Sequence, residues 1–117
     1  KVSQNPQEKE YTMTTLAIIA RVELAEGDAE KYIAGARKLV APTRQEAGCE
    51  LYGFGVDPNE PNVVWISEQW ASKAHLDDHL GAPHVQEFMA FAATLDIRAM
   101  DARQYTVDTV GTVELPE

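Results

Sequence analysis

The segment TTLAIIARVEL, residues 14–24, places the strongest constraint on the fold because its first half is apolar on both sides. Its residues are aliphatic or β-branched and alternate with a period of two, which is typical of a β-strand. One face carries Leu16, Ile18, Ala20, Val22 and Leu24. The opposite face begins with Ala17 and Ile19, ahead of Arg21 and Glu23. Such a strand needs an apolar cover on each side of its sheet.

A helix pattern follows this first strand. Asp28 is a suitable N-cap, Gly48 a suitable stop, and Pro42 is a flaw that can kink the helix near its end. The residues at helical spacing are Ala29, Ile33, Ala36, Val40 and Thr43.

The remaining segments predict a hairpin, two helices and a last strand. Residues 49–57 and 62–71 alternate, and the turn residues DPNEPN between them favour an antiparallel hairpin. Ser72 is a good N-cap for a helix that runs to about Gly81. Pro83 then suits the first turn of another helix. Residues 101–115 read as the final strand.

The resulting order, β-α-β-β-α-α-β, predicts an α+β, ferredoxin-like split-βαβ fold. In that fold a four-stranded antiparallel sheet carries helices on one face only. The other apolar face is then a contact surface, and a second copy related by a two-fold axis is its simplest cover. We therefore expect a homodimer. The predicted core consists of Leu16, Ile18, Val22, Ile33, Val40, Leu51, Val64, Ile66, Leu76, Val85, Phe88, Met89, Tyr105 and Val107.

Length and charge narrow the function classes. The 117 residues suit one domain, which we expect to span residues 13–117 after a polar leader or disordered tail at 1–12. A formal net charge of -9 disfavours nucleic-acid and anionic-membrane partners. There is no apolar run of membrane-spanning length. Cys49 is the only cysteine, so no internal disulfide forms, and a cytoplasmic location is the simpler expectation.

The run SEQWASKAHLDDHLGAPH, residues 67–84, holds all three histidines and allows three interpretations. His75 and His79 are one helical turn apart and could bind a metal with Asp78 or His84, although the run lacks the glutamate of an HExxH motif and the chain has no cysteine cluster.

The second interpretation is a solvated helix surface without a function. The third is acid–base chemistry, in which His79 faces a pocket beside Glu68 and Trp70, two residues on the same strand face. A buried structural histidine would show the same spacing. We expect position 79 to be partly exposed.

Residues 46–89 closely resemble the antibiotic biosynthesis monooxygenase family, and weaker motifs extend the resemblance over most of residues 14–110. The resemblance rests on Glu46, Gly48, Cys49, Tyr52, Asp57, Pro58, Glu68, Trp70, Leu76, His79, Pro83, His84 and Phe88. It implies a dimeric α/β barrel with a pocket between sheet and helices. It also implies oxidation of quinols or aromatic polyketides by O2 without metal, flavin or haem.

From this resemblance we expect His79 to be the base or anion partner and Glu68 to orient a histidine or to be structural. Trp70, Tyr52 and His84 are the expected substrate-binding residues. No role carries over to His75, since the family usually has a small apolar residue there. Residues 14–24 also lack the asparagine on which haem-degrading relatives rely, and this absence disfavours a haem-based function.

Three functions stay open at this point. The first is a cofactor-independent monooxygenase for a quinol-like or phenolic small molecule. The second is an isomerase or degrading enzyme for a small phosphorylated signalling sugar. The third is a dimeric binding or stress-response module without catalysis.

Overall fold

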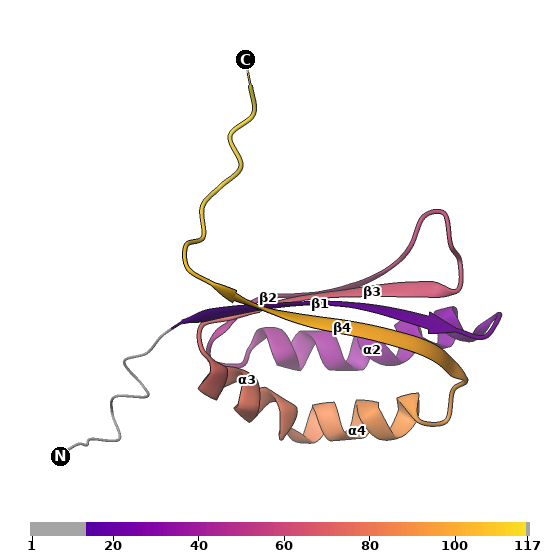
Figure 1. The fold of residues 1–117 in the computed structure, drawn as a ribbon. Helices are drawn as coiled ribbons and strands as arrows, with labels where there is room; N and C mark the ends of the chain where they lie inside the picture. Colours follow the sequence, from indigo (N-terminus) through magenta and orange to yellow (C-terminus); the bar gives the residue numbers. More distant parts are fainter. Residues whose placement is uncertain (1–13, 117) are drawn as a thin grey trace.

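The computed structural model describes residues 14–116, so the predicted leader or tail at 1–12 lies outside it. Its strands are β1 (Thr15–Leu24), β2 (Cys49–Val56), β3 (Val63–Trp70) and β4 (Ile97–Val107). Its helices are α2 (Asp28–Arg44), α3 (Lys73–Leu80) and α4 (Pro83–Ala92). Figure 1 shows one sheet with all three helices on the same side. The predicted element order and the ferredoxin-like α+β class are confirmed.

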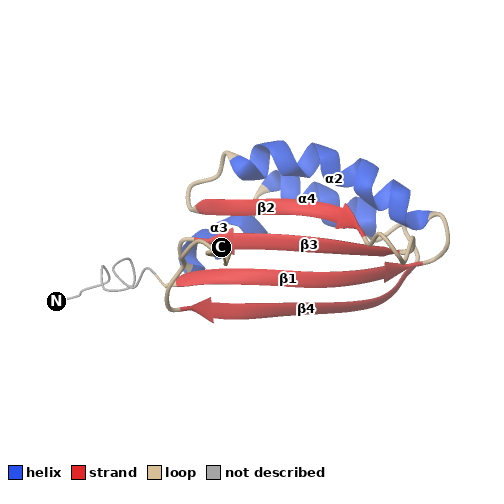
Figure 2. Cartoon of the chain, turned by 90° about the horizontal axis from the view of Figure 1, so that it is seen from above, coloured by secondary structure: helices blue, strands red, loops and turns tan. Residues whose placement is uncertain are grey.

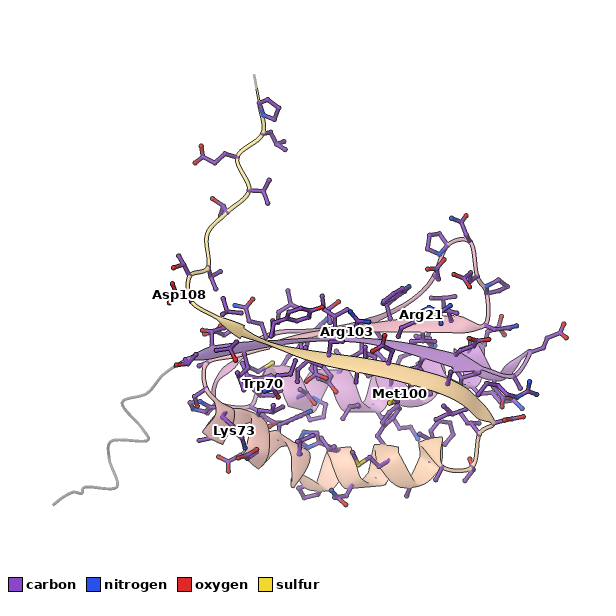
Figure 3. All side chains as sticks on the ribbon, viewed as in Figure 1. Arg21, Trp70, Lys73, Met100, Arg103 and Asp108 are labelled. Carbon is purple, nitrogen blue, oxygen red and sulfur yellow. The ribbon has the colours of Figure 1, made fainter. Side chains whose placement is uncertain are left out.

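The sheet is antiparallel throughout, with the strand order β2-β3-β1-β4 (Figure 2). β1 therefore lies inside the sheet, where its two apolar faces are expected. Ile18 pairs with Glu68 of β3 and with Gln104 of β4, so these three residues share the helix-facing side. In the side-chain view, Trp70 and Met100 project toward the helices, whereas Arg21 and Arg103 lie on the opposite side (Figure 3).

The core lies between the sheet and α2. Val22, Val64 and Trp70 are fully buried from the sheet side. The buried stripe of α2 consists of Ala29, Tyr32, Ala36, Leu39 and Thr43. The predicted stripe is thus rotated slightly, because Ile33 and Val40 are only partly buried while Tyr32 and Leu39 point inward.

The helix boundaries follow the predicted signals closely. Ser72 caps α3 by accepting a hydrogen bond from His75 N, and Pro83 occupies the first turn of α4. The cap of α2 differs from the prediction: Gly27, at φ 88°, precedes the helix, and Asp28 is its first residue. The Asp28 carboxylate instead accepts a hydrogen bond from Asp96 N.

Three predicted core residues are exposed. Leu51 and Tyr105 lie on the face of the sheet that carries no helices, and Met89 lies on α4, where it borders a cavity between that helix and the sheet. Ile19 (45 % exposed) and Trp65 (37 %) share that sheet face. We call this surface the open face. Period-two alternation identifies two apolar faces, but it does not say which of them the helices cover.

The last strand was predicted too far along the chain. β4 spans Ile97–Val107, and residues 108–116 form no regular structure. The reason is the start of its partner: β1 begins at Thr15, which pairs with Val107, so residues after Val107 have no partner within β1. Residues 108–116 leave the sheet on the side away from the helices (Figure 1).

Candidate active site

A cavity of about 550 Å³ lies between the helix-facing side of the sheet and helices α3 and α4. Ile18, Ile66 and Ala102 contribute to its sheet wall, and Phe88 contributes to its helix wall. Its polar lining residues are Tyr32, Tyr52, Glu68, His79, Arg103 and Gln104. An apolar cavity with a few convergent polar groups is typical of a small-molecule site.

Glu68 and Trp70 project from the same side of β3, as the alternation predicts. Trp70 Nε1 donates a hydrogen bond to Glu68 Oε1 at 2.9 Å. Burial raises the pKa of Glu68, and the hydrogen bond from Trp70 opposes part of that rise. Trp70 is fully buried and is not among the residues that line the cavity. It therefore holds the Glu68 carboxyl group by this hydrogen bond without facing the cavity itself.

His79 lies in the last turn of α3 and is only 2 % exposed, which corrects the expected partial exposure. The Ser72 cap starts the helix so that Leu76 and His79 face inward, one turn apart. The imidazole packs against Trp70, with ring centroids 4.6 Å apart, and edge-on against Tyr52 at 5.2 Å. Its ring lines the cavity.

Glu46 is the hydrogen-bond partner of His79, and it was missed as a site residue. Its Oε2 lies 2.9 Å from His79 Nδ1 and 2.6 Å from His84 Nε2. An ionised carboxylate oxygen accepts both N–H groups, which fixes His79 with its proton on Nδ1. Glu46 therefore occupies the orienting position that the family resemblance allowed for Glu68.

His84 lies outside the main cavity. It borders a separate groove of about 460 Å³ between α2 and α4, together with Lys38 and Phe91. Its side chain is partly exposed, whereas that of His79 is buried. Glu46 thus joins a histidine in the cavity to a histidine near the surface.

His75 does not converge with His79, although both belong to α3. Its Nδ1 lies 2.7 Å from Ser72 Oγ. Its ring packs so closely over Gly48 that a Cβ there would clash with His75 Cγ. Gly48 also has φ 81°, which favours glycine. The role of His75 is therefore in packing the start of β2 against α3.

Two tyrosines line the cavity beside Glu68. Burial is the main cause that raises the pKa of Tyr32 to about 12, and it also raises the pKa of Tyr52. The Glu68 charge adds to both shifts. Both phenols therefore stay protonated at neutral pH and can donate to an oxygen atom of a ligand. Tyr32 was not predicted as a site residue, since its helix position alone indicates only a core aromatic.

Glu46, His79 and His84 are also the residues that could hold a metal. Their ligand atoms lie within 4.8 Å of one another. Two imidazoles and one carboxylate suit divalent transition metals. The predicted pair of His75 and His79 is not part of this set, since Ser72 engages the His75 ring.

Comparisons with known proteins agree with this architecture. A family model described as antibiotic biosynthesis monooxygenase matches residues 15–90. The crystal structure of PA3566 from Pseudomonas aeruginosa is similar with a TM-score of 0.74 and 31% sequence identity, over 82% of this chain and 96% of that chain. SO0527 from Shewanella oneidensis gives a TM-score of 0.73 and 26% identity, over 80% and 90% of the two chains. The uncharacterized protein sll1783 from Synechocystis is 26% identical over 98 residues, covering 84% of this chain and 67% of that protein.

Proposed function

Because the chain belongs to the antibiotic biosynthesis monooxygenase family, we propose that it oxidises a quinol-like or phenolic small molecule with O2, without metal, flavin or haem. The observation that carries this proposal is the oriented histidine in the cavity. Glu46 accepts a hydrogen bond from the Nδ1–H group of His79, so the lone pair on Nε2 stays free to accept a proton. The same ring lines a mostly apolar cavity of about 550 Å³. This is the geometry of a base held in one tautomer by a carboxylate.

The reaction begins with proton transfer to His79 Nε2 from an acidic O–H or C–H group of the substrate. The resulting anion is electron-rich and reacts with O2, so that a C–O bond forms and a ring-carbon peroxide results after return of the proton. Loss of the remaining C–H proton then breaks the O–O bond and leaves a carbonyl group and water. A ring carbon that carried hydrogen becomes C=O, one oxygen atom of O2 enters the product and the other leaves in water, and the substrate supplies all the electrons.

The cavity supports an aromatic substrate more than a phosphorylated one. Its walls are mostly apolar, and Arg103, the one cationic residue that borders it in the described part of the chain, directs its side chain to the opposite face of the sheet. Tyr32 and Tyr52 can donate hydrogen bonds to the oxygen that becomes negative when the substrate loses its proton. A dry site strengthens such interactions.

The other predicted site residues have supporting roles in this proposal. Trp70 holds Glu68 and packs against His79, so it shapes the base instead of contacting the substrate directly. His84 shares the Glu46 carboxylate with His79 and acts through it. Glu68 lines the cavity, and burial raises the pKa of its carboxyl group.

The proposal includes a homodimer formed through the open face. Ile19 and Trp65 expose apolar surface at its centre, next to Tyr105 and Leu51. Pairing this face with its copy would cover all four side chains, as the family resemblance implies.

The net charge of -9 disfavours nucleic acid and anionic membranes as partners. Among residues 14–116, no helix combines the length and apolar character needed to cross a bilayer. We propose a cytoplasmic location on the ground of the unpaired Cys49.

The test is O2 uptake with a panel of hydroquinones, naphthoquinols and anthrone-type phenols, combined with ¹⁸O₂ labelling. We expect at least one substrate to take up one labelled oxygen atom per O2 consumed. Simple autoxidation would release hydrogen peroxide without labelling the organic product, so the two are distinguished by mass spectrometry. Binding of such compounds without turnover would favour the non-catalytic binding module.

A further inference from the structure

The helices do not cover the full width of the helix-facing side of the sheet. Viewed from above the sheet, they lie toward the β2 edge, and β4 forms the opposite edge (Figure 2). Met100, Ala102 and Gln104 of β4 pair with helix-facing residues of β1 and line the cavity. Met89 of α4 lines the same cavity and is 50 % exposed, and Met100 is 55 % exposed. The cavity therefore opens to solvent between α4 and β4, and we call this opening the mouth.

The cavity has an aromatic end and an aliphatic end. Its aromatic lining side chains are those of Tyr32, Tyr52, Phe54 and Phe88, which contact one another with ring centroids between 5.2 and 6.1 Å apart. His79 adjoins this cluster through Tyr52. Where α4 ends and β4 begins, the lining is aliphatic or thioether and carries no charge, since it consists of Met89, Ala92, Ala93, Ile97 and Met100. An aromatic ring thus matches the end beside His79, and a saturated chain matches the mouth.

The strand register separates the two ends. Glu68 of β3 is a partner of Ile18, whereas Met100 of β4 pairs with Val22, further along β1. This offset along the strand, together with two strand spacings, places the Cα atoms of Glu68 and Met100 about 16 Å apart. Figure 3 shows Trp70 and Met100 projecting toward the helices from different parts of the sheet. A single ring at the aromatic end therefore does not reach the mouth.

The two methionines at the mouth suit a flexible apolar partner. Met89 comes from a helix and Met100 from a strand, so they border the mouth from two sides. Exposed apolar side chains that gather at one place mark a contact surface. Thioether side chains are unbranched and adapt to the shape of what they contact. Because the mouth is continuous with the cavity, one molecule can occupy both.

We propose that the substrate is a quinol or phenol that carries an unbranched aliphatic chain of several carbon atoms. Its ring lies beside His79, and its chain runs along Ala102 to Met89 and Met100 at the mouth. This inference rests on the proposed function, because the oxidation of the ring defines which end of the molecule enters first. The chain does not react. Its burial supplies binding energy that holds the ring against the base.

Binding of a chain-length series to the full-length protein tests this proposal. The probes are methyl-, butyl-, hexyl- and octylhydroquinone, titrated without O2 in a calorimeter at concentrations below their self-association. We expect Kd to fall by roughly two- to fourfold for each methylene group that becomes buried, and to level off once the chain has passed the mouth. An affinity that does not depend on chain length overturns the inference.

Charged variants at the mouth locate the chain. Met100→Glu and Met89→Glu each place a carboxylate beside the chain, from two different elements, and both positions are exposed enough to accept a charge. Each should lower the ratio of octyl- to methylhydroquinone affinity by roughly tenfold or more, because the carboxylate is partly desolvated by the chain. Met100→Leu should keep the ratio. Ala90→Glu is the matched control, since it adds the same charge on α4 outside the cavity lining and should leave the ratio unchanged. If both glutamate variants fold and neither alters the ratio, the chain binds elsewhere and the inference is wrong.

Oxygen uptake with the same compounds separates this inference from the proposed function. Affinity that rises with chain length, without any O2 uptake, supports the chain site and overturns only the oxidation. Oxidation of methyl- and octylhydroquinone with equal kcat/KM and equal affinity supports the oxidation and overturns the chain site.

Discussion

Glu46 Oε2 lies 2.9 Å from His79 Nδ1, across 33 residues of sequence. The same oxygen lies 2.6 Å from His84 Nε2, so one carboxylate engages two imidazoles. This contact distinguishes His79 from an ordinary buried histidine, because it fixes the tautomer while the ring borders a cavity.

Replacing Glu46 with glutamine should lower turnover by roughly 10²-fold, within the range for acid–base catalysis. The amide is close in shape but has no charge to stabilise the protonated imidazole. The measurement is the rate of O2 uptake at saturating substrate. If Glu68→Gln has the larger effect and Glu46→Gln almost none, then Glu68 is the functional partner and the assignment of Glu46 is wrong.

Replacing His79 should lower turnover by roughly 10²–10⁴-fold. Because the side chain is buried, His79→Ala also leaves a cavity beside Trp70 and should lower the melting temperature. His79→Gln keeps more of the volume and separates the two effects. His75→Ala is the control and should leave the rate nearly unchanged. Full activity of both His79 variants in folded protein would exclude His79 as the base.

The sequence predicted the strand faces well because alternation reports them directly. Glu68 and Trp70 share the helix-facing side of β3, and Ser72 and Pro83 begin their helices as expected. These features depend on a few neighbouring residues. The family was likewise recognised from the resemblance of residues 46–89 to its pattern, and the family model that matches residues 15–90 confirms it.

The site partner and the strand ends could not be predicted in this way. The contact of Glu46 with His79 depends on how the loop before β2 sits against α3, and no local period encodes that placement. Glu46 was part of the matched pattern, but a matched position does not specify its contact. Similarly, β4 ends at Val107 because β1 begins at Thr15, which is a property of the partner strand.

Glu68→Gln should make the protein more stable, relative to the parent, as the pH rises. The folded-state pKa of Glu68 is raised, mainly by burial, above its ordinary value of 4.5. Below pH 4.5 the carboxyl is mostly neutral in both the folded and the unfolded chain, so no charge has to be buried. As the pH rises through the raised pKa, ionisation favours the unfolded chain and the free energy of unfolding falls. Glutamine stays neutral and retains an oxygen that can accept from Trp70. Urea unfolding between pH 4 and neutrality, at about one-unit steps, measures the difference. A difference that is constant with pH would contradict the raised pKa.

Ile19→Asp should dissociate the proposed dimer. Ile19 lies on the central strand β1 at the middle of the open face, and burying an unpaired charge there costs several kcal/mol. Light scattering should give about twice the chain mass of 12.9 kDa for the parent and the single-chain mass for the variant. Ala90→Asp adds the same charge on the exposed side of α4 and should leave the dimer intact. A parent protein that remains monomeric at micromolar concentration would exclude the dimer.

Chelation separates acid–base chemistry from metal chemistry at the same three side chains. A metal bound between Glu46, His79 and His84 would take the Nδ1 lone pair of His79 and leave Nε2 carrying the proton. His79 could then no longer accept a proton from a substrate in the cavity. We therefore expect turnover to survive treatment with a chelator, and added Zn²⁺ to inhibit if it binds at these residues. Elemental analysis of untagged protein accompanies the rate measurement. Stoichiometric transition metal in the purified protein, together with activity that is lost on chelation and restored by the metal, would replace the base mechanism with a metal-dependent one.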